Sequence, residues 1–410
     1  MKKIALLSVI TASVLMAGGY KIPETSLNGV ALSAANIAHN KSADAAYYNP
    51  ANMVFMEDKN HLEVDLTYIG LDPVNYKGTV SGTGPYDLDA QSESFIVPSV
   101  HYVSGKAGET RIGLSITTPG GLSKRWDTEP AKTSAEEFTL KVIEINPSVA
   151  IPLNDKVAVA FGVRIVHSEG IVKSNGTAAL APGVYRRVSR DMTGESLDFG
   201  YNLALSYKPN IEWDVGLTYR SQVNLSEQGN AKLTEALMGG TYNGDASVTI
   251  PLPATASIAV AYNLPSKTTV ELVYERNMWS AYKSLDFDYD GTITNPVLVG
   301  VFDNPITKNW NDTNAFRLGI TQELDALTLM AGAVYDESPV PDETIGFELP
   351  DSDSISVSLG SRYQINKELD VGLAALYSMR QERTVKNASL DGEFTNANVL
   401  IVSAGVGYKF

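Results

Sequence analysis

Charged side chains share one face of several predicted strands, which is where this sequence could bind an ionic group. The members are Arg111, Arg164, Arg220, Arg317 and Arg362, with Glu63, Asp65, Asp198, Asp214, Glu271 and Glu275. One interpretation is a structural network of ion pairs, because arginine in a low-dielectric interior is usually held by carboxylates. The other is that one or two guanidinium groups bind a ligand carboxylate through charge-assisted hydrogen bonds. We choose Arg164 and Arg317 as candidates for ligand binding.

Metal binding and catalysis have weaker support. Asp286, Asp288, Asp290 and Gly291 resemble the start of an EF-hand loop, but Val297 stands at the twelfth position, where glutamate is required. The 4 histidines show no ligand spacing, and the chain has no cysteine. Phosphate-loop and nucleophile-elbow motifs are absent from the sequence. We predict no metal, no cofactor and no enzymatic activity. A Ser-His-Asp hydrolase remains open, since its residues need not be close in sequence.

The strands that carry these charges have an apolar second face. Leu62, Val64, Leu66 and Tyr68 alternate with Glu63, Asp65 and Thr67, and residues 196–207 and 400–410 follow the same pattern. Successive side chains of a strand point to opposite faces, so each ribbon contacts two different environments. A soluble sandwich would bury the apolar face. A membrane barrel turns it outward and places aromatics at the interface, as the terminal Tyr408 and Phe410 suggest.

We predict about 14 such strands, an even number, as single-chain bacterial barrels require. The expected ranges are 60–71, 92–104, 109–118, 139–152, 156–173, 195–208, 211–227, 244–263, 267–289, 308–323, 326–337, 353–364, 369–384 and 396–410. Short connections alternate with long ones near 72–91, 119–138, 174–194, 228–243, 290–307, 338–352 and 385–395. This asymmetry is typical of barrels with short periplasmic turns and long external loops. The predicted fold is an all-β, antiparallel transmembrane barrel.

Composition restricts the remaining classes. The chain has 410 residues and a formal net charge of −15, which argues against a nucleic-acid partner. After the N-terminus no run of about 18 apolar residues occurs, so membrane-spanning helices are not expected. Residues 1–18 read as a secretory signal, with Lys2 and Lys3, an apolar core over 4–16, and a processing site within Ala17–Gly19. Together with a barrel, this predicts the outer membrane of a Gram-negative bacterium.

Residues 19–59 do not alternate and are predicted to form a plug, or hatch, inside the barrel of residues 60–410. Leu27, Val30 and Ala34 recur at helical spacing, with Ser26 or Asn28 as a possible cap. Asn49-Pro50-Ala51 predicts a turn, because proline fixes its own φ and pushes the residue before it toward extended backbone. Many small apolar residues and few charges argue against a disordered tail.

These features resemble the FadL family of outer-membrane transporters for long-chain fatty acids or aromatic hydrocarbons. The resemblance covers most of the chain. It rests on Asn49-Pro50-Ala51, Trp279-Ser280-Ala281-Tyr282, Phe316-Arg317-Leu318-Gly319, Tyr335-Asp336-Glu337-Ser338-Pro339-Val340-Pro341 and the terminal Phe410. It implies passive transport through a 14-stranded barrel closed by a hatch. It also implies capture of ligand at the external loops, an apolar site against the hatch, and exit sideways into the bilayer.

The exit that the resemblance implies is a gap at an inward kink of the third strand. Here that strand is expected to run from Arg111 to Thr118 and to meet Pro119, Gly120 and Gly121, our candidate lateral gate. Proline lacks a donor for the ladder and glycine weakens strand packing, so pairing should fail there. The start of an ordinary loop is an equal alternative.

The expected partners are hydrophobic small molecules, outer-membrane lipid and lipopolysaccharide, and the barrel-assembly machinery through the C-terminal strand, with the protein as a monomer. One departure concerns the ligand. Fatty-acid members of the family tend to carry a basic residue where this chain has Asn311, between Trp310 and Asp312. This favours a neutral hydrophobic ligand over a fatty acid. A general porin for small polar solutes is the alternative function.

Overall fold

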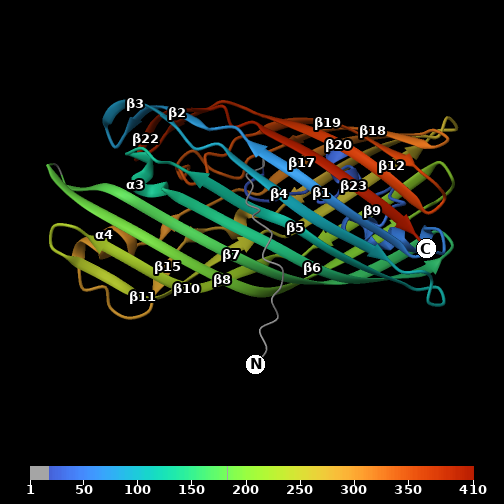
Figure 1. Ribbon diagram of the computed structural model, residues 1–410, viewed down its shortest axis with the longest axis horizontal. Coiled ribbons are helices and arrows are strands. Elements are labelled where there is room, and N and C mark those ends of the chain that lie inside the picture. Colours follow the sequence, from blue (N-terminus) through green and yellow to red (C-terminus); the bar gives the residue numbers. More distant parts are fainter. Residues whose placement is uncertain (1–17, 182) are drawn as a thin grey trace.

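The computed structural model describes residues 18–181 and 183–410, which form a closed antiparallel barrel of 14 strands (Figure 1). The predicted signal peptide lies almost wholly outside the described residues. The ring closes where β1 (His61–Leu71) pairs with β23 (Val399–Lys409) in a continuous register from His61↔Lys409 to Leu71↔Val399. Asn60 and Phe410 exchange backbone hydrogen bonds of 2.9 and 3.0 Å just beyond this pair. The predicted fold class is therefore confirmed.

Nine further barrel strands are single segments, and three are each broken into two or more segments. The single ones are β4 (Glu93–Val103), β5 (Arg111–Arg125), β6 (Glu137–Asn154), β7 (Val157–Ala181), β8 (Val184–Tyr207), β17 (Thr313–Glu323), β18 (Leu327–Asp336), β19 (Ser354–Gln364) and β20 (Leu369–Arg380), besides β1 and β23. The broken ones are β9 (Trp213–Arg220) with β10 (Val223–Glu235), β11 (Gly240–Leu252) with β12 (Thr255–Asn263), and β13 (Thr268–Asn277) with β15 (Phe287–Tyr289). Pro253 stands in the second break, as a residue without a ladder donor should.

The barrel has its apolar face outward. On β1 the side chain of Leu66 is 56% exposed, whereas that of its neighbour Asp65 is 0% exposed. The same alternation follows β23, where Leu400, Val402 and Val406 are exposed and Ser403 is buried. A water-soluble sandwich would show the reverse, because its apolar side chains would meet in the centre. The exposed apolar faces suit hydrocarbon, and the buried charges face the lumen.

The two ends of the barrel differ (Figure 1). At the end that holds Phe410, the strands are joined by short turns, for example at 155–156, 264–267 and 324–326, as expected from the sequence. The opposite end, here called the loop end, carries most of the additional elements. Two predicted long loops are wrong: residues 174–194 and 228–243 mostly continue β7, β8, β10 and β11 as long hairpins. Their many polar residues hid this, since strands above a membrane need no apolar face.

Four short strands form a separate sheet at the loop end in the order β21-β22-β2-β3. They are β2 (Asn75–Val80), β3 (Thr83–Asp89), β21 (Arg383–Lys386) and β22 (Leu390–Thr395). Helices α3 (Ala131–Ala135) and α4 (Pro296–Phe302), the 3-10 turn η2 (Trp279–Ala281) and the pair β14 (Ser284–Leu285) and β16 (Ile306–Thr307) are also not part of the barrel sheet. In the described part of the chain, no helix has the length and apolarity needed to span a membrane.

Residues 18–56 lie in the barrel lumen and contact its wall. They contain α1 (Leu27–Ala31), α2 (Ala45–Tyr48) and the 3-10 helix η1 (Pro50–Phe55). The Ser26 side chain caps α1 by accepting from the Gly29 amide at 2.9 Å. Asp44 ties this segment together: its carboxylate accepts from Ser26 Oγ at 2.7 Å and from Asn36 Nδ2 at 2.9 Å. The segment is thus compact, as its composition predicted.

Inward-facing glycines of the wall make room for this segment. A Cβ on Gly319 would lie 2.9 Å from Ala35, and one on Gly332 would lie 2.6 Å from the Leu32 carbonyl oxygen. Gly216 similarly faces the Ile37 carbonyl, at 2.9 Å. Real Cβ atoms do not approach backbone this closely. The glycines therefore allow the segment to pack directly against strand backbone.

Candidate functional site

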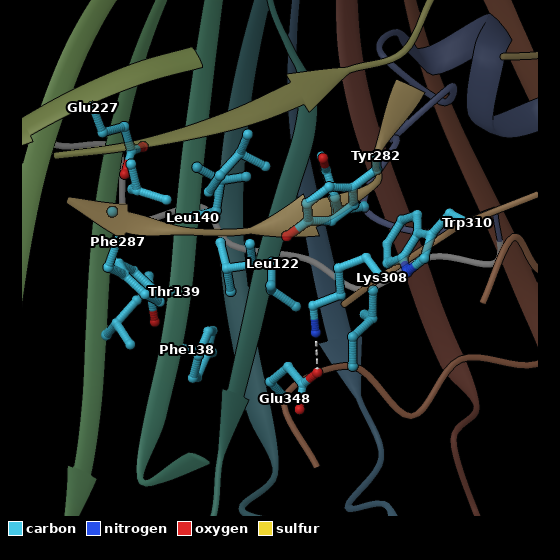
Figure 2. Close-up of a pocket in the computed structure, with 17 residues that line it drawn as sticks. Leu122, Phe138, Thr139, Leu140, Glu227, Tyr282, Phe287, Lys308, Trp310 and Glu348 are labelled. Carbon is cyan, nitrogen blue, oxygen red and sulfur yellow. Dashed lines mark hydrogen bonds and ion pairs between the residues drawn. The ribbon is translucent and has the colours of Figure 1, made fainter. Parts of the chain in front are cut away.

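An apolar pocket lies in the lumen toward the loop end (Figure 2). Its empty volume is about 560 Å³, part of it open to the surroundings. The lining residues are Tyr20, Leu122, Phe138, Thr139, Leu140, Gly170, Val172, Glu227, Val248, Ile250, Tyr282, Leu285, Phe287, Lys308, Trp310, Glu348 and Leu349. A mostly apolar hollow with a few polar groups is the usual form of a small-molecule site.

Aromatic rings close the pocket on the side of the hatch. The ring centroid of Tyr20 lies 4.7 Å from Trp279 and 5.7 Å from Trp310, and Tyr282 lies 4.8 Å from Trp310. Tyr20 Oη donates a 2.6 Å hydrogen bond to the Pro251 carbonyl, which fixes the ring across the lumen. Edge-to-face contacts of this kind hold aromatic clusters in defined orientations. The first described residues of the chain thus form one wall of the pocket.

Three charged side chains, Lys308, Glu348 and Glu227, stand out in a mostly apolar lining (Figure 2). Lys308, only 4% exposed, donates from Nζ to Glu348, and the two side chains come from different loops. Glu227 of β10 accepts a 2.9 Å hydrogen bond from Ser168 Oγ. The lysine and its carboxylate neutralise each other, so together they present a dipole to a ligand more than a net charge.

The predicted ligand-binding arginines do not line this pocket. Arg164 Nε donates to Glu144 at 2.8 Å, and Nη1 donates to the Ser221 carbonyl. Arg317 lies 3.3 Å from Glu275 and 3.6 Å from Glu24, and donates to the Ser33 carbonyl at 3.0 Å. Each guanidinium is therefore already satisfied by protein groups. Their role in binding a ligand carboxylate stays a prediction.

Most of the remaining inward charges pair with one another or with the hatch, whereas Asp198 accepts hydrogen bonds from Ser196 Oγ and the Ser226 amide. Arg362 contacts Glu63 and lies 2.8 Å from Asp370. Arg111 donates to the Met56 carbonyl at 2.8 Å, and Glu271 accepts from the Ile37 amide at 2.6 Å. These contacts anchor the hatch to the wall, which matches the predicted structural network.

The other sequence candidates lie away from the pocket. Asp286 and Asp288 are exposed, with Phe287 buried between them on the opposite face. Among the residues described, no group of three or more His, Asp or Glu is arranged to hold a metal ion. Asn311 is exposed, and its amide donates to the Pro339 carbonyl at 2.9 Å, while Trp310 beside it lines the pocket.

The hatch motif holds the lumen segment to the barrel. Asn49 is extended, with φ −152° and ψ 90°, and Pro50 begins η1 as the sequence predicts. Asn49 Oδ1 accepts from the Ala51 amide at 3.1 Å, while Nδ2 donates to the Ile37 carbonyl at 2.9 Å and the Leu205 carbonyl at 3.3 Å. The motif therefore fixes one turn of the hatch and links it to β8.

The third barrel strand, β5, does not end at Thr118 as expected. It continues to Arg125, and its pairing with β6 shifts register between Thr117 and Gly120. Its pairing with β4 covers only Val100–Val103 against Gly113–Ile116, although both strands run on toward the loop end. A β-bulge in β5 accounts for this, because the extra residue bends the strand inward and away from β4.

The bent part of β5 pairs with the hatch instead. The Gly121 amide donates to the Tyr20 carbonyl at 2.8 Å, and the Ile22 amide donates to the Pro119 carbonyl at 2.9 Å. Beside this contact, Ile22, Glu24, Val97, Ser99, Thr118 and three neighbours line a hollow with an empty volume of about 260 Å³. Pairing of β5 with β4 is thus absent at Pro119, Gly120 and Gly121, whereas Gly120 and Gly121 remain paired with β6. Their role as a lateral gate stays a prediction.

Sequence reasoning missed Tyr20, Leu122 and Lys308. Tyr20 follows two glycines directly after the apolar N-terminal run, which is a signal that could have been used. Lys308 lies in a loop with no periodic pattern, and only the closed barrel places it opposite Glu348.

Comparison with known proteins extends these observations. Residues 8–410 match the family described as outer membrane protein transport protein (OMPP1/FadL/TodX). A long-chain fatty acid transport protein of Escherichia coli O6:H1 is 25% identical over 376 residues, covering 82% of this chain and 80% of that protein. The solved structure of a Pseudomonas aeruginosa FadL homologue covers 96% of this chain and 100% of its own, with a TM-score of 0.84 and 19% identity.

A second solved structure, the Pseudomonas putida toluene transporter TodX, has a TM-score of 0.71 at 14% identity and covers 94% of this chain and 98% of its own. At these identities the two structures show a shared fold. The family match spans nearly the whole chain, and its members are outer-membrane proteins. The chain therefore belongs to the OMPP1/FadL/TodX family of outer-membrane transport proteins.

Proposed function

We propose that this protein carries hydrophobic molecules, such as long-chain fatty acids or aromatic hydrocarbons, passively across the outer membrane. The observation that carries the proposal is the apolar pocket inside the barrel, which Tyr20 lines, while Ile22 lines the hollow beside the gap at β5. Relatives named for fatty-acid and toluene transport support the substrate class. Ligand enters among the external loops, occupies the pocket against the hatch, and leaves sideways into lipid. The proposed transport involves no catalysed reaction, so the proposal includes no enzymatic activity.

The physical need for such a route follows from hydrophobicity. Transfer of each methylene group from water into apolar surroundings contributes about 0.8 kcal/mol, so a long chain resists crossing a water-filled pore. An apolar pocket that opens toward the bilayer avoids the aqueous step. Since the transfer is downhill into lipid, no energy source is required.

The exit depends on the hatch segment that lies between pocket and gap. Tyr20 lines the pocket, and Ile22, two residues further, lines the hollow between β4 and β5. Movement of this short segment away from Pro119–Gly121 would connect the two spaces. β4 and β5 do not pair with each other here, so an opening breaks only the backbone hydrogen bonds that join Tyr20 and Ile22 to β5.

A disulfide between the hatch and β5 tests this route. Lys21 and Gly120 form an isolated antiparallel bridge. The hydrogen bonds of this bridge join the flanking residues, so Lys21 and Gly120 themselves are a non-hydrogen-bonded pair. Cα atoms of such pairs are about 4.5 Å apart, within the range that a disulfide spans. The chain has no cysteine, so a Lys21→Cys, Gly120→Cys double variant can form only this bond. Oxidation should stop uptake of radiolabelled palmitate and toluene by expressing cells, and reduction should restore it.

The reduced double variant is the internal control, because it carries the same substitutions without the crosslink. Full uptake by the oxidised protein would contradict exit beside Tyr20–Ile22. A general porin would instead show steady ion conductance and uptake of polar solutes that the crosslink does not change.

Further parts of the proposal concern sites and partners. Direct binding of a ligand carboxylate by Arg164 or Arg317, contact with lipopolysaccharide, recognition of the C-terminal strand by the assembly machinery, and a monomeric state are predictions. The division into a signal peptide, a hatch at 19–59 and a barrel at 60–410 is proposed with them. Phe410 supports recognition of the C-terminal strand, since its ring stacks on Tyr408, with 5.5 Å between the ring centroids, and is exposed at the barrel surface.

A further inference from the structure

Glu227 is a buried carboxylate in the wall of the apolar pocket, and no cation accompanies it. It belongs to β10, is 3% exposed, and forms no ion pair within the described ranges. The charged groups that act on it most strongly, Asp198 and Glu169, are both acidic. Lys308, the cation of the pocket lining, is already bound to Glu348, and both lie across the pocket from Glu227 (Figure 2). Burial of a charge without a partner is costly, so this position needs an explanation.

One oxygen of this carboxylate has a hydrogen-bond partner and the other does not. Oε1 of Glu227 accepts a 2.9 Å hydrogen bond from Ser168 Oγ, whereas Oε2 has no hydrogen bond among the described residues. Ser168 Oγ also lies 2.8 Å from Ser196 Oγ, which donates to Asp198 at 2.6 Å. The two hydroxyl groups thus supply two protons to three contacts. Because a carboxylate can accept about four hydrogen bonds, Glu227 has unused acceptor capacity.

The free oxygen lies where two hollows meet. A Cβ on Gly170 of β7 would collide with Oε2 of Glu227, so the glycine leaves room for the carboxylate. Gly170 and Glu227 line both the apolar pocket and a second hollow with an empty volume of about 260 Å³. The other residues around the second hollow are Val172, Met192, Thr193, Gly194, Ala246, Ser247, Val248 and Phe287. Oε2 therefore borders space that a ligand in the pocket can reach.

We propose that Glu227 accepts a hydrogen bond from the hydroxyl group of an otherwise apolar ligand whose hydrocarbon part occupies the pocket. The inference rests on the proposed function and names a substrate class within it: phenols and alcohols, in preference to bare hydrocarbons and to carboxylates. A hydroxyl group satisfies Oε2 through a charge-assisted hydrogen bond.

Other head groups fit this position less well. A bare hydrocarbon leaves Oε2 without a partner, and a site built to bind a hydroxyl group discriminates against an analogue that lacks one. A carboxylate head brings another negative charge beside Glu227, Asp198 and Glu169. An ammonium head would pair with Glu227, but its exit into hydrocarbon would cost the ion its hydration. The neutral hydroxyl group suits both the site and the route into lipid.

The alternative is that Glu227 serves only to join strands. Its bond to Ser168 links β10 to β7 beside a stretch where β8 has no partner on its other edge. Residues Asn202–Tyr207 of β8 pair with β9, and Val188–Glu195 pair with β10, which leaves 196–201 between them. In that role Glu227 stabilises the wall, and its removal would weaken binding of every ligand alike.

The test measures equilibrium binding of toluene, 4-methylphenol and 4-methylbenzoate to the purified full-length protein in detergent, with binding to empty micelles subtracted. The probes share a methyl-substituted ring and differ in the head group. Glu227→Met should lower 4-methylphenol affinity about 10-fold, because a hydrogen bond to a charged group is lost, and leave toluene affinity within about 2-fold. It should raise 4-methylbenzoate affinity, because a like charge is removed.

Two further variants complete the test. Glu227→Gln keeps the shape and a carbonyl acceptor but loses the charge, so its affinity for 4-methylphenol should lie between those of the wild type and Glu227→Met. If the methionine variant does not fold, the glutamine variant decides. Glu195→Met is the matched control, since Glu195 of β8 lies opposite Gln228, the next residue of β10, but is exposed on the outer face. It should bind all three probes as the wild type does.

The outcomes separate this site from the proposed transport. Equal loss of all three probes with a lowered unfolding temperature assigns Glu227 to the wall and overturns the hydroxyl site, as does unchanged binding of 4-methylphenol. In both cases toluene binding by the wild type still supports transport. A wild-type protein that binds neither neutral probe also overturns the site, and uptake of toluene and palmitate by expressing cells then decides the transport proposal separately.

Discussion

Arg317 shows how a single residue links hatch and barrel. It belongs to β17, yet its guanidinium reaches Glu24 and the Ser33 carbonyl of the lumen segment as well as Glu275 of β13. All of these side chains are nearly or fully buried. The desolvation of such charges is offset only when each has its partner. The same holds for Arg164, which donates hydrogen bonds to Glu144 and to the Ser221 carbonyl.

The substitution Arg317→Met should lower the free energy of unfolding by about 3–5 kcal/mol, because it leaves buried carboxylates uncompensated. Chemical unfolding of the protein in lipid vesicles measures this. Arg186→Met is the control, since Arg186 forms no ion pair within the described ranges and its Nη1 donates to the carbonyl of its neighbour Tyr185. A loss under about 1 kcal/mol would mean that the network is dispensable. Palmitate affinity of the same variant decides whether Arg317 also contacts a ligand.

At the scale of elements, the hatch packs closely against the barrel wall because the wall has glycines, which carry no side chain, at the points of contact. Gly319, Gly332 and Gly216 each face a residue of the lumen segment closely enough that a Cβ would collide. A plug attached only by ion pairs could tilt, whereas direct backbone packing fixes its position. The hatch then holds Tyr20 and Ile22 against β5, where the gap lies.

Gly332→Ala should displace the hatch without unfolding the barrel. Its Cβ would meet the Leu32 backbone, and overpacking of this kind typically costs about 1–3 kcal/mol. We expect faster tryptic cleavage after the exposed Lys41, while the barrel keeps its resistance to unfolding. Gly300→Ala is the matched control, because a Cβ at Gly300 meets no atom within 4 Å. Identical cleavage rates in the two variants would show that the position of the hatch does not depend on the contact between Gly332 and Leu32.

At the scale of the whole molecule, the barrel is turned inside out relative to a soluble protein. Leu359 is 69% exposed, and Leu197, Leu272 and Leu373 are each above 60%, whereas Arg111 and Asp65 are 0% exposed. In water such a surface would aggregate. In a bilayer it is the favourable arrangement, since a closed ring leaves no free sheet edge toward lipid apart from the gap between β4 and β5, and the apolar side chains meet hydrocarbon.

Leu66→Lys should therefore destabilise the protein in phospholipid vesicles by up to about 2–4 kcal/mol, the range for a lysine near the bilayer midplane. Equilibrium unfolding from vesicles gives the value. Ile211→Lys is the comparison: Ile211 is 92% exposed but lies in the turn between β8 and β9, where a charge meets water. Equal effects of both substitutions would contradict the assignment of the β1 outer face to lipid.

Features that depend on neighbouring residues in the sequence could be predicted, whereas features that depend on distant contacts could not. The strands with strict alternation, such as 60–71 and 353–364, were placed within one residue of β1 and β19. The Ser26 cap and the extended Asn49 also followed from local rules. The ends of β7, β8 and β10 were wrong, because strands above the bilayer have polar residues on both faces and look like loops. The continuation of β5 through Pro119 was missed because a bulge shifts its register with β6 there, and its other edge pairs with the hatch backbone, which no strand pattern encodes.

The sequence by itself determined the alternation of environments and hence the barrel, because a period of two residues is written directly into side-chain chemistry. The tertiary structure alone decided where the pocket lies, since Tyr20, Leu122 and Lys308 meet only after the ring has closed around the hatch. It also decided how the inward charges pair: Arg164 lies against Glu144 and Arg317 against Glu275. Pairing of charges depends on contacts between residues far apart in the chain, and no local pattern specifies those contacts.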